Sequence, residues 1–180
     1  MGNVAINVIK GDITKVAVDA IVNAAKKALL DDKGVDGAIY RAGGSNLMVE
    51  LQSLGKIYPG EAKITRGYNL PAKFIIHTVG PTYGWENGLE EQILRNCYYN
   101  SLDLAVEKKF KSIAFPSIST GAYCYPVEEA AQIAFKIIKE FLERKGSANT
   151  LEEITFVTYT DADYKTYRKA RDQSQLIKSE

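Results

Sequence analysis

Two glycine-containing loops carry the residues of this chain that could act on a ligand. The first reads GVDGAIYRAGG over residues 34–44, and the second reads PSISTGAY over 116–123. Glycine lets backbone N–H groups approach an anion closely, and the start of a helix adds partial positive charge. Asp36 lies within the first loop. Together these residues predict a site for a phosphate-containing ligand with an acid/base group beside it.

The elements around these loops alternate between strand and helix. Apolar patterning predicts strands at 4–9, 20–22, 63–70, 74–79, 112–115 and 154–159. Helices are expected at 36–42, 46–54, 89–105, 127–141 and 161–176, with Asn46 and Asp161 as N-caps of the second and last. This alternation predicts a three-layer α/β/α sandwich, in which ligands bind at the carboxyl ends of the strands.

Composition narrows the class of protein. A length of 180 residues with 46% hydrophobic side chains suits one domain, and a net charge of +1 provides no overall field for nucleic acid or an anionic membrane. One histidine and two cysteines argue against a zinc site of those ligands. The low cysteine content and the absence of a secretory segment or a long apolar run favour a cytoplasmic protein. We expect a monomer.

Four stretches, taken in their order and spacing, resemble a known family. They are Gly11-Asp12-Ile13-Thr14, Val22-Asn23-Ala24-Ala25, 34–44 and 115–126. Together they are similar to macrodomains of the MacroD type, which bind ADP-ribose and hydrolyse ADP-ribosyl groups. The resemblance covers nearly the whole chain. It implies a single macrodomain over 1–180 and a mixed, mostly parallel central sheet. We expect no external cofactor, because the charge-stabilising dipoles belong to the protein, and no metal, although composition argues only against zinc and not against a magnesium site of carboxylates and waters.

The resemblance also implies which residues bind the ligand. Asp12 and Ile13 would contact adenine, although Asp12 could equally cap the segment that follows it. Tyr159 would stack on the same base. The remaining candidates for contact with the diphosphate and distal ribose are Asn23, Gly34, Val35, Ser117, Ser119, Thr120, Gly121, Ala122 and Tyr123. The alternative for the second loop is a purely structural turn that requires Gly121.

Three residues are candidates for catalysis. Asp36 is the expected acid/base group, with an N-cap for the helix at 37–42 as its alternative role. Lys26 and Tyr40 occupy positions where relatives usually have asparagine and histidine, and tyrosine is a poorer proton shuttle than histidine at neutral pH. Asp31-Asp32-Lys33 replaces the usual glycines before Gly34, and Cys124 replaces another glycine. Cys124 is either a packing residue or a reactive thiol.

Two functions follow from the resemblance. The first is hydrolysis of ADP-ribosyl esters, either on mono-ADP-ribosylated aspartate or glutamate of proteins or in O-acetyl-ADP-ribose. The second is a reader that binds ADP-ribose or ADP-ribosylated proteins without turnover, which the altered first loop favours. An NAD-dependent oxidoreductase lacks support because the first strand is not followed by Gly-x-Gly-x-x-Gly. His77, inside an apolar strand, is interpreted as a core histidine without a role.

Overall fold

The computed structural model describes residues 4–27 and 33–176. Asp31 and Asp32 therefore lie outside the described residues. Six strands are present: β1 (Ala5–Lys10), β2 (Ala20–Ala25), β3 (Ala62–Arg66), β4 (Phe74–Val79), β5 (Ser112–Phe115) and β6 (Glu153–Thr158). The α-helices are α1 (Gly34–Gly43), α2 (Ser45–Leu54), α3 (Glu90–Glu107), α4 (Val127–Lys145) and α5 (Asp161–Gln173). Short 3-10 turns cover Ile13–Lys15 and Gly146–Ala148.

The strands form one sheet in the order β1-β6-β5-β2-β4-β3. All neighbouring strands are parallel except β3, which pairs antiparallel with β4. The predicted mixed, mostly parallel sheet is thus confirmed. Because β2 and β5 are adjacent at its centre, the loops that follow them lie side by side at the carboxyl edge.

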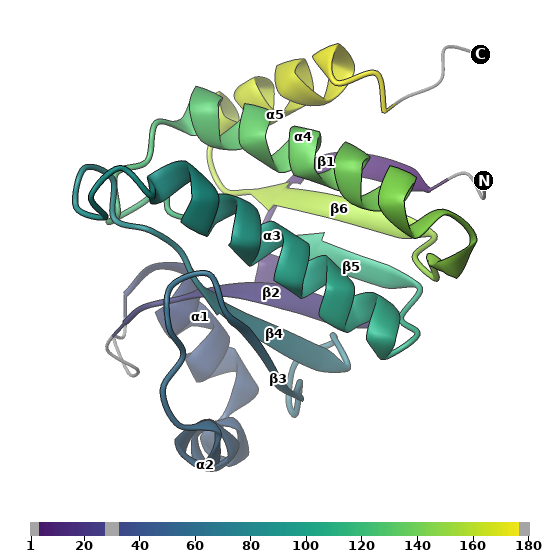
Figure 1. Cartoon of the computed structure of the whole chain (residues 1–180). Coiled ribbons are helices and arrows are strands. Elements are labelled where there is room, and N and C mark those ends of the chain that lie inside the picture. Colours follow the sequence, from purple (N-terminus) through teal and green to yellow (C-terminus); the bar gives the residue numbers. More distant parts are fainter. Residues whose placement is uncertain (1–3, 28–32, 177–180) are drawn as a thin grey trace.

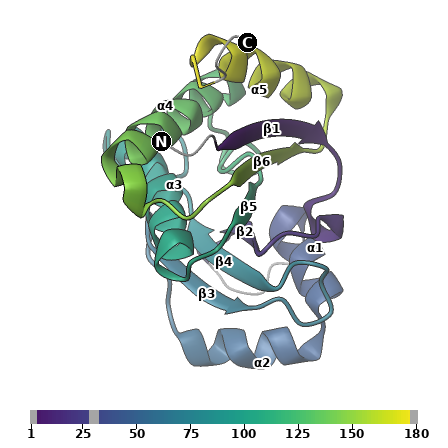
Figure 2. The ribbon, with the colours of Figure 1, turned by 90° about the vertical axis from the view of Figure 1, so that its right-hand side faces the viewer.

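Helices cover both faces of the sheet, which gives the predicted three layers. Figure 1 shows α3 and α4 in front of the sheet and α1 behind it, with α2 at the β3 end. The turned view in Figure 2 places α5 beside α4, next to β1. None of the helices in 4–27 and 33–176 combines the length and apolar character required to cross a membrane.

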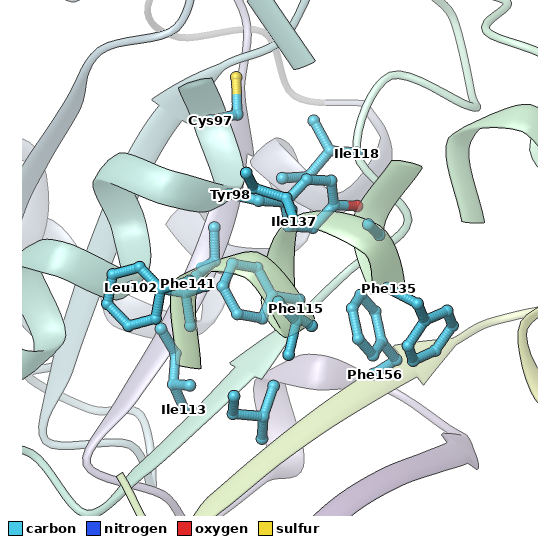
Figure 3. Close-up of a cluster of buried hydrophobic side chains, with 14 of the residues drawn as sticks. Cys97, Tyr98, Leu102, Ile113, Phe115, Ile118, Phe135, Ile137, Phe141 and Phe156 are labelled. Atoms are coloured by element: carbon cyan, nitrogen blue, oxygen red, sulfur yellow. The ribbon is translucent and has the colours of Figure 1, made fainter. Parts of the chain in front are cut away.

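The larger hydrophobic core lies between the sheet and helices α3, α4 and α5. In Figure 3, Phe115 and Phe156 come from the sheet and meet Phe135 of α4 and Tyr98 of α3. The ring centroids of Phe135 and Phe156 are 4.8 Å apart. Such aromatic contacts stabilise the fold beyond the effect of burying apolar area. This side of the sheet is therefore well packed beneath the loops at its carboxyl edge.

The smaller core lies between the other face of the sheet and α1 and α2. Its buried side chains are Ile13, Ile21, Ile39, Tyr40, Leu47, Leu51, Leu70, Ala72, Ile75, Ala114 and Val157. Residues two apart on a strand share a face, so the residues that follow Ile21 and Ile75 on this face are Asn23 and His77. The apolar surface of this face is thereby interrupted near the carboxyl ends of β2 and β4.

Some predicted boundaries were wrong. The N-cap of α2 is Gly44, at φ 84°, and not Asn46. Thr160, and not Asp161, caps α5, because its hydroxyl accepts the N–H of Asp163. Strand β3 ends at Arg66 rather than at residue 70, and β2 continues past Val22 to Ala25.

Candidate active site

A cleft of about 220 Å³ opens at the carboxyl ends of β2 and β5. It is lined by Ala24, Ala25, Lys26, Lys33, Gly34, Val35, Asp36, Gly80, Ser117, Ser119, Gly121, Ala122 and Tyr123. Both predicted loops thus contribute to one cavity. A larger and more open hollow of about 490 Å³ lies between β3 and α3, but it contains neither glycine loop.

The second loop offers a row of backbone donors. In the described residues, the N–H groups from Ser119 to Tyr123 donate to no acceptor, whereas the next two N–H groups are used. The N–H of Cys124 donates to the carbonyl of Gly121, and that of Tyr125 donates to the carbonyl of Ser119. Consecutive free N–H groups in a concave turn suit an anion with several oxygens, such as a diphosphate.

The conformation of this loop depends on close approach between two segments. Ser119 has φ 64°, an uncommon value for a side chain with a Cβ, and its hydroxyl is buried without a hydrogen-bond partner in the described residues. A Cβ on Gly80 would lie 2.0 Å from the Ser119 Oγ. The absence of a side chain at position 80 therefore leaves the space that the Ser119 hydroxyl occupies.

Gly121 has a different role from the one in the structural alternative. Its φ lies outside the left-handed region, and a Cβ there would meet nothing within 4 Å. The turn itself therefore does not require glycine at this position. The missing side chain instead leaves space within the cleft for a ligand.

Hydroxyl groups fasten the second loop from beneath. The Thr120 Oγ1 donates to the Ser117 Oγ at 2.6 Å, and the Ser117 Oγ also bonds the Tyr167 hydroxyl of α5 at 2.8 Å. Thr120 is not among the residues that line the cleft, and its predicted contact with the ligand stays a prediction. The support leaves the loop's N–H groups fixed before a ligand arrives.

Asp36 stands opposite this loop, in the first turn of α1. Its side chain is 1% exposed, and its Oδ1 accepts the Asn23 Nδ2 at 2.7 Å. The backbone N–H of Lys26 points at its Oδ2 from 3.4 Å. The N-cap position belongs to Lys33, which makes no side-chain cap, so the alternative role of Asp36 as an N-cap was wrong.

The surroundings of Asp36 shift two pKa values. Burial raises the pKa of the Asp36 carboxyl above its ordinary value, while interactions with Tyr40 and Asn23 act in the opposite direction. Burial, and then the charge of Asp36, raises the pKa of Tyr40 well above 10. Tyr40 is 7% exposed and its hydroxyl has no hydrogen-bond partner at bonding distance among the described residues. The Tyr40 hydroxyl therefore remains protonated at neutral pH, where it takes part in hydrogen bonds as a donor or as an acceptor.

Lys27 ties the two sides of the cleft together. Its backbone N–H donates to the Tyr123 hydroxyl at 3.1 Å, and its Nζ pairs with Glu86 at 2.9 Å. Glu86 also accepts the N–H of Thr82 at 3.0 Å, and that bond and Lys27 lower its pKa. Tyr123 is further held because its carbonyl accepts the N–H of Tyr83. The segment after β2 is thus joined to the second loop and to the segment after β4.

The proposed adenine residues lie outside the cleft, beside the ends of β1 and β6. The N–H of Gly11 donates to the carbonyl of Thr158 at 2.9 Å, which brings Asp12 and Tyr159 to neighbouring strand ends. Tyr159 is 80% exposed, so one face is open for stacking. The Asp12 carboxylate accepts the N–H and hydroxyl of Thr14, so it does cap the turn. Ile13 is buried, and only its backbone could serve a base.

The structure thus separates the predicted residues into three groups. Those that line the cleft are Lys26, Gly34, Val35, Asp36, Ser117, Ser119, Gly121, Ala122 and Tyr123. Those just beneath it are Asn23, Tyr40 and Thr120, and those at the adenine side are Asp12, Ile13 and Tyr159. The sequence analysis missed Ala24, Ala25, Lys33 and Gly80 as lining residues. Ala24 and Ala25 at the end of β2 and Gly80 in the Gly-Pro turn after β4 could have been found from a strand-end signal.

The two cysteines differ. Cys97 is buried, and its Sγ donates to the carbonyl of Val79. Cys124 is exposed at φ 56°, so the interpretation of it as a packing residue was wrong. In the described residues no group of three or more His, Cys, Asp or Glu side chains is placed to hold a metal ion.

Comparison with known proteins identifies the fold and the cleft together. The family described as Macro domain matches residues 22–134, which include the carboxyl end of β2, the first loop and the second loop. The chain belongs to the Macro domain family. Its resemblance to the MacroD type is therefore confirmed.

Relatives of this macrodomain carry names that refer to ADP-ribose. It is 52% identical to a macro domain-containing protein of Chlorobaculum tepidum, over 93% of this chain and 96% of that one. Human ADP-ribose glycohydrolase MACROD2 is 46% identical over 93% of this chain, which spans 39% of that protein. An O-acetyl-ADP-ribose deacetylase of Citrobacter rodentium is 47% identical, over 95% and 97% of the two chains.

A solved structure agrees with the architecture of this macrodomain. The Oceanobacillus iheyensis macrodomain with ADP superposes with a TM-score of 0.87 at 42% identity, over 92% of this chain and 89% of that chain. In this chain the two glycine loops lie at the strand ends of that shared fold, where they line the cleft.

Proposed function

We propose that this macrodomain binds ADP-ribose and hydrolyses ADP-ribosyl esters, on mono-ADP-ribosylated aspartate or glutamate of proteins or in O-acetyl-ADP-ribose. The observation that carries the proposal is the position of Asp36 across one 220 Å³ cleft from the free N–H groups of 119–123. Names of relatives as ADP-ribose glycohydrolase and O-acetyl-ADP-ribose deacetylase support the same substrate class.

The ligand would lie along the carboxyl edge of the sheet, from the ends of β1 and β6 to the end of β2. Adenine would lie over Tyr159 and beside Asp12, and the diphosphate would accept hydrogen bonds from the second loop. The distal ribose would then reach Asp36 and Lys26 at the end of β2. Ordering the ligand against fixed donors places its reacting carbon near the carboxylate without any movement of the loop.

Asp36 would act on water in the reaction. Its Oδ2 takes a proton from water as the water oxygen adds at the ester, and the ester bond then breaks as the protonated Asp36 returns that proton to the departing oxygen, which gives a carboxylic acid, a hydroxyl on the ribose and the Asp36 carboxylate again. A carboxylate whose pKa is raised by burial is a stronger base than an exposed one. The Tyr40 hydroxyl, which stays protonated, can donate to the developing negative charge.

The second candidate is a reader that binds ADP-ribose without turnover. Lys26 and Lys33 line the reacting end of the cleft, where the MacroD resemblance implies asparagine and glycine. Lysine can donate hydrogen bonds but cannot accept them, so it cannot replace an amide that orients water in both ways. This difference lies between the end of β2 and the start of the first loop, and it leaves the diphosphate donors unchanged.

One paired experiment separates the two candidates. Release of ADP-ribose from a mono-ADP-ribosylated protein is followed over time, and calorimetry measures the affinity for free ADP-ribose with the same preparation. Binding together with release supports the hydrolase, whereas binding without release selects the reader. AMP serves as the control ligand, because it lacks the second phosphate. Equal affinity for AMP and ADP-ribose would contradict the assignment of the second loop.

The proposal names a class of macromolecular substrate but adds nothing on oligomeric state or location. ADP-ribosylated proteins are the proposed macromolecular substrates, and a monomeric state and a cytoplasmic location stay predictions of the sequence.

A further inference from the structure

A row of buried polar side chains crosses the sheet beneath Asp36. Asn23 of β2 pairs in register with His77 of β4, and Thr65 of β3 reaches the same ring from the edge of the sheet. Asn23 and His77 are fully buried, and Thr65 is 2% exposed. Polar groups in such a position cost free energy unless they are hydrogen-bonded, so an apolar row would be the simpler core.

The sequence of contacts along this row runs in one direction from the Asn23 amide nitrogen, while the Asn23 Oδ1 is buried without a hydrogen-bond partner among the described residues. The Asn23 Nδ2, which can only donate, contacts the Asp36 Oδ1 at 2.7 Å and the His77 Nδ1 at 3.2 Å. The His77 Nδ1 must therefore accept, which places the ring proton on Nε2. That proton points to the Thr65 Oγ1 at 2.8 Å. Burial lowers the pKa of His77 to about 3, so the ring stays neutral and keeps its acceptor.

We infer that His77 is a positioning residue for Asp36, because it accepts one proton of the Asn23 amide and thereby aims the other at the Asp36 Oδ1. This inference rests on the proposed hydrolase function. With Oδ1 occupied by Asn23, Oδ2 is the oxygen that remains for water, since its contact with the Lys26 N–H is long at 3.4 Å.

The opposite orientation of the amide shows what His77 prevents. A flipped Asn23 would turn its Oδ1 toward the Asp36 carboxylate and place two acceptors against each other. A ring with its proton on Nδ1 would favour that flip, because it would donate to the amide oxygen. In the tautomer that the Asn23 amide requires, the Thr65 Oγ1 accepts the Nε2 proton, so the edge strand keeps that buried ring proton hydrogen-bonded.

The titratable groups that face Asp36 are few. Tyr40 approaches from its own helix, Lys26 approaches from the segment after β2, and Lys33 lines the same cleft. From the sheet, Asp36 meets Asn23, with His77 behind it. A change at His77 can therefore reach the carboxylate through the amide, without changing any of the other charged groups.

The test compares three substitutions on β4 and β3 with one control. His77→Leu removes the acceptor for Asn23, and His77→Asn restores a side-chain oxygen near the position of Nδ1. Thr65→Val removes only the far partner of the ring. Thr78→Val is the matched control, because Thr78 follows His77 on β4 and is fully buried. This substitution also removes one hydrogen bond, which the Thr78 hydroxyl donates to the carbonyl of Glu61.

The measured quantities are the pH dependence of kcat for ADP-ribose release and the affinity for ADP-ribose. We expect His77→Leu to move the acid limb of kcat upward by about one pH unit, because a lost hydrogen bond to a carboxylate favours its protonated form about tenfold. His77→Asn should recover at least half of that shift. Thr65→Val should move the limb in the same direction by less, and Thr78→Val should not move it. The affinity of all four variants should stay within about threefold of the parent.

A readout without turnover keeps this inference separate from the proposed function. Carbon-13 NMR of the Asp36 carboxyl follows its titration in the parent and variants even when no ADP-ribose is released. Unchanged titration in both His77→Leu and Thr65→Val would overturn the inference, whichever function the cleft has. If His77→Leu does not fold, Thr65→Val against Thr78→Val decides the question alone. If the parent releases no ADP-ribose and the titration of the Asp36 carboxyl is shifted in the variants, the hydrolase function is rejected and the positioning role of His77 is retained.

Discussion

The two loops that line the cleft differ in how they are held and in what they retain of the family pattern. The second loop is fastened by Tyr167, by Gly80 beneath Ser119 and by the bond from Tyr83 to Tyr123, and its N–H groups are free for a ligand. The first loop places Asp36 by one strong bond from Asn23 but has lysines at the reacting end. Binding of the diphosphate thus depends on the second loop, which keeps the family pattern, whereas turnover depends on the residues around Asp36, where the chain departs from that pattern.

The largest effect should come from the carboxylate of the first loop. We expect Asp36→Ala to lower kcat for ADP-ribose release by about 10²–10⁴-fold, because general acid/base groups contribute on this scale. Affinity for ADP-ribose should stay within a few-fold, since the diphosphate donors are elsewhere. Stopped time courses and calorimetry measure the two quantities. A large loss of affinity with unchanged kcat would mean that the first loop binds and does not catalyse.

Two glycines test whether the second loop is a fixed anion site. Gly80→Ala should lower the melting temperature and ADP-ribose affinity together, because its Cβ would overlap Ser119, and overpacking costs about 1–3 kcal/mol. Gly121→Ala is the matched partner. It should keep the melting temperature, since its Cβ meets nothing, and reduce affinity alone. Equal melting temperatures for both variants would contradict the close approach of the two segments.

Lys26→Asn sharpens the comparison at the first loop. It restores a group that donates and accepts hydrogen bonds where relatives of the MacroD type have asparagine, so we expect turnover to rise several-fold. The measurement is kcat for ADP-ribose release, and Lys136→Asn on the exposed side of α4 is the control for loss of charge. A slower Lys26→Asn enzyme would show that the lysine takes part in binding or catalysis. No release by either protein would favour the reader.

The smallest effect concerns stability and pH. The folded protein holds the Asp36 proton to higher pH than the unfolded chain, so this residue favours folding below its ordinary pKa and disfavours folding as pH rises through its folded pKa. Asp36→Asn should therefore gain melting temperature relative to the parent as pH rises above the ordinary carboxyl pKa. Asp161→Asn, in the first turn of α5 and exposed, is the control. The opposite slope would mean that Asp36 is stabilised as a carboxylate in the fold.

Local chemistry was readable from the sequence. The glycine loops, their place after strands, and Asp36 as the carboxylate between them follow from short stretches of chain, because turns and helix starts are set by neighbouring residues. The resemblance then supplied the mixed sheet. Two local alternatives were not resolved in this way. Asp36 is the third residue of α1 rather than its cap, and Gly121 is needed for space rather than for φ.

Contacts across the sheet were decided only by the tertiary structure. Asn23 and His77 are 54 residues apart, and they meet because β2 and β4 are parallel neighbours in a particular register. Gly80 likewise gains its importance from Ser119, which arrives on a different strand connection. Periodicity identifies a strand, but strand order and register depend on the summed packing of distant segments. For that reason the sequence by itself determined which groups could do chemistry, and the fold alone determined which of them touch.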